Sequence, residues 1–248
     1  MTADYDGYNF DRFRELANAD GLSKYERIGF PDSYRQGLEK LIFEDILAKA
    51  PRLSGARSLK VLDIGPGCSD LPAYLADYCQ AQGHTLFQAD STEMLSLTPE
   101  RAGVVKIAGF FPETAEEIKA KSGGVDVIVC YSVFHYVFAE ANVWQFLDAV
   151  LELLNDAGQA LIGDIPNISK RKRFFASANG VRFHQEFMRT DEVPEVHFNC
   201  PEPGRIDDAL LLALVMRSQA SGCDAYLVPQ VEGLPFANRR DDLLIRKP

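Results

Sequence analysis

The stretch Val61-Leu62-Asp63-Ile64-Gly65-Pro66-Gly67-Cys68-Ser69-Asp70 decides the fold class of this chain. An apolar run is followed by a glycine turn, and a helix-like segment comes next. This pattern is typical of a buried parallel strand that delivers a ligand to a helix N-terminus. Glycine tolerates positive φ and lets a ligand approach the backbone closely. The stretch therefore predicts a ligand-binding turn, although a tight turn without a ligand would fit the same letters.

The spacing of the turn bears on which ligand it binds. A nicotinamide-binding turn reads Gly-x-Gly-x-x-Gly and would place its third glycine at position 70, where this chain has Asp70. A carboxylate there is a poor neighbour for a pyrophosphate. The spacing therefore disfavours NAD and favours a ligand that carries positive charge.

Strand-like and helix-like segments alternate after the turn. Alternation of this kind predicts a parallel sheet with helices on both faces. Strands are expected at 60–64, 85–89, 103–108, 125–130, 159–165, 224–230 and 241–246, and helices at 9–50 (two, joined by a turn), 70–82, 112–122, 142–155 and 206–221. Residues 168–204 read as irregular.

Composition excludes several classes of protein. The chain has 248 residues, of which 46% are hydrophobic, and no apolar run reaches the length of a membrane span. The polar first ten residues do not resemble a secretory signal. Five scattered cysteines without a Cys-x-x-Cys pair favour reduced thiols and a cytoplasmic location. A net charge of −10 repels nucleic acid and anionic membranes.

The Asp63-x-Gly65-x-Gly67 spacing resembles motif I of the class I S-adenosylmethionine-dependent methyltransferases, with Ser69 at the usual third glycine. The resemblance covers residues 59–166 and, more loosely, 223–246. It implies an α/β fold: a Rossmann-like, seven-stranded mixed sheet, mostly parallel, with an antiparallel C-terminal hairpin and helices on both faces. We expect a helical N-terminal cap at 1–58 and a core at 59–248, in which 168–221 is a substrate-side insertion.

The resemblance also implies a cofactor site for S-adenosylmethionine. Asp63 would lie near the amino group of the cofactor, and Asp90, at the end of the second strand, would accept hydrogen bonds from the ribose hydroxyls. The alternative for Asp90 is an ordinary aspartate at a strand end. The alternative for Met94 and Phe110 is a plain position in the hydrophobic core. The full set of expected cofactor residues is Asp63, Gly65, Pro66, Gly67, Asp90, Ser91, Met94, Gly109, Phe110, Tyr131 and Ser132.

Catalytic candidates are less sharply marked. His135 follows the fourth strand, where the family places the methyl acceptor, and a structural histidine is an equal alternative. Asp164 follows the fifth strand, and His184 lies in the insertion. The adjacent Asp-Asn pattern of metal-dependent enzymes is missing, so no metal is predicted. The signatures Asn/Asp-Pro-Pro-Tyr and Pro-Cys of nucleic-acid methyltransferases are missing as well.

Substrate contacts are expected from an aromatic loop of the N-terminal cap and from a basic cluster at 170–173. The loop would act as a lid or as a homodimer contact, and the cluster as an anion clamp or a solvated helix face. The candidate residues are Tyr25, Arg27, Tyr34, Tyr136, Asn167, Lys170 and Arg173.

The function predicted from the sequence is transfer of a methyl group from S-adenosylmethionine to a small acceptor, leaving S-adenosylhomocysteine. The acceptor is expected to be sugar-like or anionic, and to be methylated on oxygen before nitrogen. The alternatives are an RNA or protein methyltransferase that docks through the basic cluster, and a non-catalytic module that binds the cofactor. A nicotinamide oxidoreductase ranks behind them.

Overall fold

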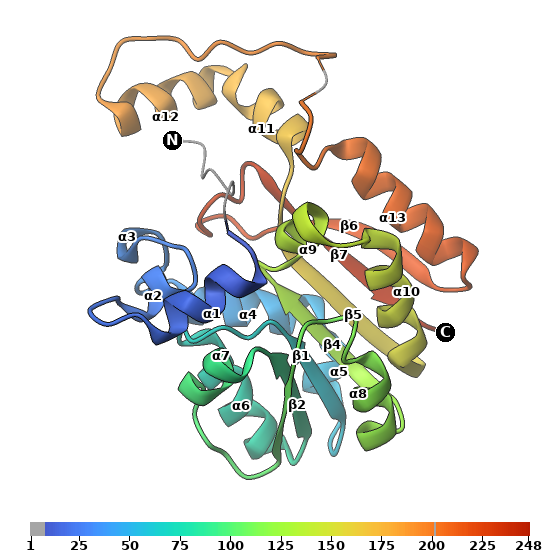
Figure 1. The fold of residues 1–248 in the computed structure, drawn as a ribbon. Helices are drawn as coiled ribbons and strands as arrows, with labels where there is room; N and C mark the ends of the chain where they lie inside the picture. Colours follow the sequence, from blue (N-terminus) through green and yellow to red (C-terminus); the bar gives the residue numbers. More distant parts are fainter. Residues whose placement is uncertain (1–7, 201) are drawn as a thin grey trace.

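A computed structural model describes residues 8–200 and 202–248 (Figure 1). Its centre is one seven-stranded sheet in the order β3-β2-β1-β4-β5-β7-β6, in which β7 runs antiparallel to β5 and β6. The strands are β1 (Lys60–Ile64), β2 (Thr85–Asp90), β3 (Val104–Ala108), β4 (Val125–Tyr131), β5 (Leu154–Pro166), β6 (Asp224–Pro229) and β7 (Arg240–Arg246). This confirms the mixed sheet with an antiparallel C-terminal hairpin.

Helices cover both faces of the sheet. Successive side chains of β1 point to opposite faces of the sheet. Leu62 and Ile64 belong to the core on the face covered by α8 (Ala115–Ser122), α10 (Val143–Leu153) and α13 (Asp208–Ala220). Val61 packs on the other face with α4 (Glu39–Lys49), α5 (Pro51–Gly55) and α6 (Leu71–Gln82). Because every central strand is buried on both faces, its sequence is a continuous apolar run, which is why the strands could be predicted.

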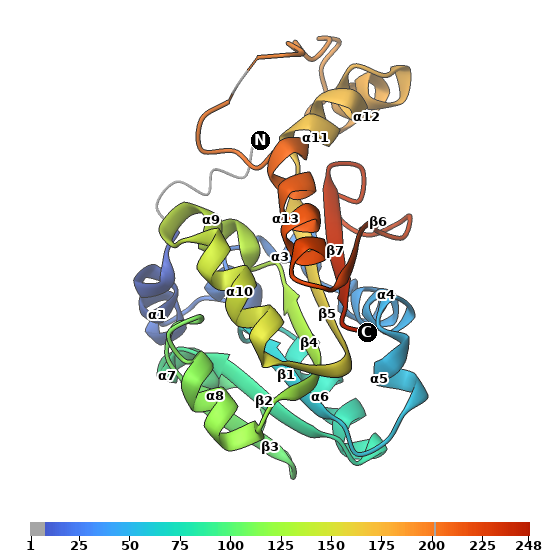
Figure 2. The ribbon, with the colours of Figure 1, turned by 90° about the vertical axis from the view of Figure 1, so that its right-hand side faces the viewer.

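The N-terminal region is more broken than the two helices expected. It contains α1 (Phe10–Asn18), α2 (Lys24–Arg27), α3 (Asp32–Arg35) and then α4 and α5. Gly29 and Gly37 adopt positive φ between the short helices, which explains the interruptions. Figure 2 shows α1 beside α7 (Thr92–Leu97) and α9 (Phe134–Glu140), on the body of the molecule.

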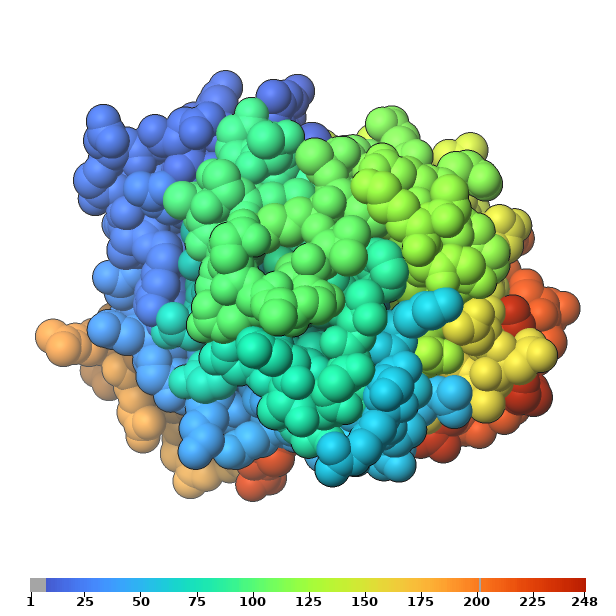
Figure 3. All heavy atoms as spheres, turned by 90° about the horizontal axis from the view of Figure 1, so that it is seen from below, coloured from blue at the N-terminus to red at the C-terminus, as the bar shows by residue number. Residues whose placement is uncertain are grey.

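Two further helices occupy the segment expected to be irregular. They are α11 (Ile168–Phe175) and α12 (Ala178–Met188). Asn167 caps the first, since its side chain accepts hydrogen bonds from the backbone N–H groups of Ser169 and Lys170, and Ser177 caps the second. Residues 168–200 and 202–204 form an arm that projects beyond the carboxyl end of β5 and past the edge of the body in the view from below (Figures 1 and 3).

Candidate functional site

The carboxyl ends of β1 to β4 open into a cavity of about 890 Å³, a volume that includes its solvent-filled mouth. The strand ends and the loops and helices that follow them contribute Ile64, Gly65, Pro66, Gly67, Ser69, Leu71, Ala89, Asp90, Met94, Gly109, Phe110, Phe111, Tyr131, Ser132, Val133, Tyr136, Val137 and Glu140, and the N-terminal region contributes Phe10, Phe13, Ile28, Phe30 and Arg35.

The glycine turn forms the floor of the cavity. Gly65 and Gly67 have φ of +67° and +63°. A Cβ on Gly65 would meet Val133 at 2.6 Å, and one on Gly67 would meet Ile28 at 2.8 Å. Both positions therefore require glycine for conformation and for space.

Asp90 is joined to the turn by hydrogen bonds. Its Oδ2 accepts from the Gly67 N–H at 3.1 Å, and its Oδ1 accepts from the Ser91 N–H at 2.7 Å. A carboxylate has about four acceptor positions, so two remain for a ligand in the cavity. Burial raises the pKa of Asp90 to about 6, while its two backbone hydrogen bonds oppose the shift.

Asp63 borders a smaller adjoining space, which Gly65 and Pro66 also line. Burial, followed by the negative charge of Asp90, raises the pKa of Asp63 to about 7, and the Gln88 side chain opposes this shift. No Lys or Arg forms an ion pair with Asp63 in the part of the chain that the structure describes. A buried carboxylate without a counter-ion suits a ligand that brings a positive charge.

The expected cofactor residues thus gather in one place. Nine of the eleven line the main cavity: Gly65, Pro66, Gly67, Asp90, Met94, Gly109, Phe110, Tyr131 and Ser132. Asp63 borders the adjoining space, and Ser91 caps α7 by accepting a hydrogen bond from the Met94 N–H.

The three catalytic candidates do not line the cavity. His135 is only 4% exposed, and burial lowers its pKa well below the usual range, with smaller effects from the charges of Arg240 and Arg35. His184 lies on α12 in the arm, at the edge of the Phe175 ring. Asp164 is buried between Arg240 and Arg35.

Of the expected substrate residues, only Tyr136 lines the cavity. Each of the others has partners elsewhere. The Tyr25 hydroxyl donates to Asp70, Arg27 donates to backbone carbonyls, Tyr34 packs on Phe236, Asn167 caps α11, Lys170 pairs with Asp241, and Arg173 pairs with Asp208.

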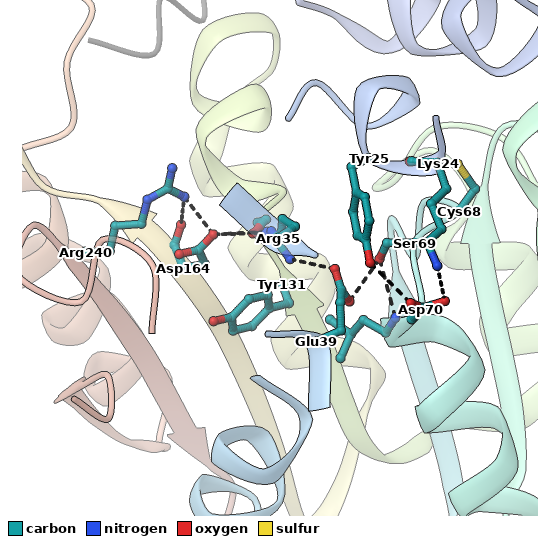
Figure 4. Close-up of polar contacts among 12 residues, drawn as sticks. Lys24, Tyr25, Arg35, Glu39, Cys68, Ser69, Asp70, Tyr131, Asp164 and Arg240 are labelled. Atoms are coloured by element: carbon teal, nitrogen blue, oxygen red, sulfur yellow. Dashed lines mark hydrogen bonds and ion pairs between the residues drawn. The ribbon is translucent and has the colours of Figure 1, made fainter. Parts of the chain in front are cut away.

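Arg35 is the main residue that sequence reasoning missed (Figure 4). Its side chain is 5% exposed. The guanidinium lies over the rings of Phe30 and Tyr131, at 4.6 and 5.7 Å from their centroids. It also lies 3.7 Å from Glu39 Oε1 and 3.4 Å from Asp164 Oδ2. Two carboxylates therefore balance the charge of this cavity-lining arginine.

The described residues contain neither a metal-binding group nor a helix that could span a membrane. Within residues 8–200 and 202–248, no three His, Cys, Asp or Glu side chains are grouped so as to hold a metal ion. None of the described helices has the length and apolar character needed to cross a membrane.

Comparison with known proteins agrees with this geometry. Residues 62–162 match a family model described as a methyltransferase domain. A search of curated proteins finds no matching relative. Among solved structures the chain is similar to the plantazolicin methyltransferase BpumL in complex with S-adenosylhomocysteine and a substrate analogue, with 12% identity, 87% of each chain covered and a TM-score of 0.58.

Two further structures cover nearly the whole chain. Magnesium protoporphyrin IX methyltransferase from Synechocystis PCC 6803 with bound S-adenosylhomocysteine has 14% identity, a TM-score of 0.52, and covers 98% of this chain and 96% of its own. The N-methyltransferase NodS from Bradyrhizobium japonicum WM9 has 10% identity, a TM-score of 0.52, and covers 96% and 98%. At these identities the likeness establishes the fold.

Proposed function

Because this chain belongs to the class I S-adenosylmethionine-dependent methyltransferases, we propose that it methylates a small, uncharged molecule held in the cavity described above. The observation that supports a small acceptor is the cover over the site. Phe10, Phe13, Ile28, Phe30 and Arg35 come from the N-terminal helices and line the cavity together with the strand ends.

The residues present fit the cofactor. Asp63 offers a buried negative charge to the amino group, and Asp90 offers free acceptor positions to the ribose hydroxyls. Arg35 is the only Lys or Arg among the described cavity-lining residues, so we assign to it the carboxylate of the methionine half. Met94 and Phe110 supply apolar surface for the adenine.

When bound, S-adenosylmethionine supplies an electrophilic methyl group on a sulfonium. The protein's own contribution is to orient the two reactants and to exclude water. The aromatic rings of Phe13, Phe30 and Tyr136 line the cavity, and they are the residues that would orient a planar or apolar acceptor.

An uncharged acceptor replaces the anionic one suggested by the basic cluster at 170–173. Lys170 and Arg173 do not line the cavity, and Lys172 pairs with Glu202. We retain oxygen as the first choice of acceptor atom. We also propose a cytoplasmic location, in keeping with five free cysteines.

The test is calorimetric titration with S-adenosylhomocysteine, with NAD as the comparison ligand. We expect micromolar binding of the former alone. Asp90→Ala should weaken that binding by about 1–3 kcal/mol, because charge-assisted hydrogen bonds are lost, while Ser54→Ala, at an exposed position of α5, leaves it unchanged. Equal binding of NAD, or full affinity in a folded Asp90→Ala protein, would contradict the proposal.

A further inference from the structure

The end of β4 carries an unusual pair of residues. Ser132 follows β4 with φ of +61°, and Asp164, near the end of the adjacent parallel strand β5, also has φ of +61°. Non-glycine residues avoid this left-handed region unless the surroundings hold them there. The Ser132 N–H donates to the Gly163 carbonyl at 3.0 Å, which fixes the two strand ends together.

The side chains of this pair are both joined to Arg35; Figure 4 shows Arg35 between Asp164 and Glu39. The Ser132 hydroxyl donates to Asp164 Oδ2, and Arg35 Nη2 donates to Ser132 Oγ. The directions follow from the chemistry of the groups, because a guanidinium can only donate and an ionised carboxylate can only accept. Arg240 Nη1 donates to the same side-chain oxygen of Asp164 at 2.7 Å and to the backbone carbonyl of Asp164 at 2.9 Å.

This arrangement uses the only proton of Ser132 and one of its two lone pairs. One lone pair remains, and Ser132 lines the cavity whereas Asp164 does not. In the strand order, Ser132 lies on the opposite side of the glycine turn from Asp90 and Gly109, the side that the nucleoside would leave free. The cavity therefore presents a hydrogen-bond acceptor there, from a hydroxyl that has no proton to give.

We infer that Ser132 is a positioning and specificity-determining residue that selects protic methyl acceptors, meaning hydroxyl groups and primary or secondary amines. Such an acceptor donates its hydrogen to Ser132 Oγ, which aims the lone pair of the reacting atom. An aprotic counterpart such as an ether or a tertiary amine places no hydrogen there and meets an oxygen lone pair instead. Arg35 and Asp164 act by fixing the direction of the Ser132 hydroxyl. This inference rests on the proposed function.

The test uses four small probes on the protein saturated with S-adenosylhomocysteine. Phenol and aniline are protic, and anisole and N,N-dimethylaniline are their methylated counterparts. Dissociation constants come from ligand-observed NMR titration. We expect the protic member of each pair to bind about tenfold more tightly, the effect of one hydrogen bond.

Two variants and a control make the test specific. Ser132→Ala and Ser132→Gly should both abolish the preference, and the glycine variant suits a φ of +61° if the alanine variant folds poorly. Ser54→Ala should retain the preference. The affinity for S-adenosylhomocysteine is measured in both Ser132 variants, so that every probe titration is made on saturated protein.

Several results would overturn the inference. They are equal binding of protic and methylated probes, binding of none of the four, a preference that survives both Ser132 variants, or a large loss of S-adenosylhomocysteine affinity in those variants. That last result would make Ser132 a cofactor residue. If the wild-type protein fails to bind S-adenosylhomocysteine at all, the proposed function fails first and this inference fails with it.

Discussion

At the scale of single residues, Asp63 combines a cost in stability with the role in cofactor binding that we propose for it. Its pKa of about 7 in the folded protein lies above the value of 3.8 for an ordinary aspartate. The folded state therefore binds the proton more tightly. The carboxyl costs no folding free energy below about pH 4, and the cost grows as the pH rises towards 7.

Asp63→Asn should therefore stabilise the protein more at high pH than at low pH. A shift from 3.8 to about 7 implies that the advantage of the variant grows by about 2 kcal/mol between pH 5.5 and pH 8.5. Urea denaturation at both values measures it. The same variant should bind S-adenosylhomocysteine less tightly, since the amide offers no charge to the amino group. A stability gain that is independent of pH would mean that Asp63 ionises normally.

Arg35 is a second residue whose removal has a defined cost. Its loss leaves Glu39 and Asp164, which are both buried, without this cation. Breaking a buried ion pair from one side typically costs about 3–5 kcal/mol. We expect Arg35→Ala to lower the free energy of unfolding by that order, measured by chemical denaturation. Arg12→Ala removes an exposed pair with Glu15 and should change it by less than about 0.5 kcal/mol; a similar loss in both variants would refute this reading.

At the scale of elements, the cap and the glycine turn fit each other. A Cβ on Gly67 would meet Ile28, next to α2, at 2.8 Å. Gly67→Ala should displace the cap and weaken S-adenosylhomocysteine binding at least tenfold in calorimetry. Adding Ile28→Ala should recover part of that loss, because it removes the clash while the unfavourable φ of +63° remains. If the affinity losses of the two single variants simply add in the double variant, Ile28 does not clash with a side chain at position 67.

The same elements show what the sequence could and could not predict. The strands and the turn were predictable because their signals are local: apolar runs, an Asp-x-Gly-x-Gly spacing and a strand-end aspartate. Helices α11 and α12 also have local signals in the caps Asn167 and Ser177, but the other polar residues of this segment resemble caps equally well. Arg35 had none, since its contact with Asp164 joins residues 129 positions apart, and only the assembled sheet brings them together.

At the scale of the whole molecule, the cavity and the arm are separate in the chain. Every described residue that lines the cavity lies between Phe10 and Glu140, whereas the arm lies at 168–200 and 202–204. Residues 191–197 carry no helix or strand, and Glu192 and Glu195 are exposed. A glutamate-specific protease should therefore cut there first, as exposed irregular segments are preferred sites.

The cut protein should still bind the cofactor product. Hydrogen bonds between β5 and β7 hold the two fragments together, so they should co-elute in gel filtration and bind S-adenosylhomocysteine within about threefold of the intact affinity. Replacing Glu192 and Glu195 with Gln should slow the cut and confirm its position. A tenfold loss of affinity after cutting would instead show that the arm contributes to the site, because none of the cavity-lining residues is removed by the cut itself.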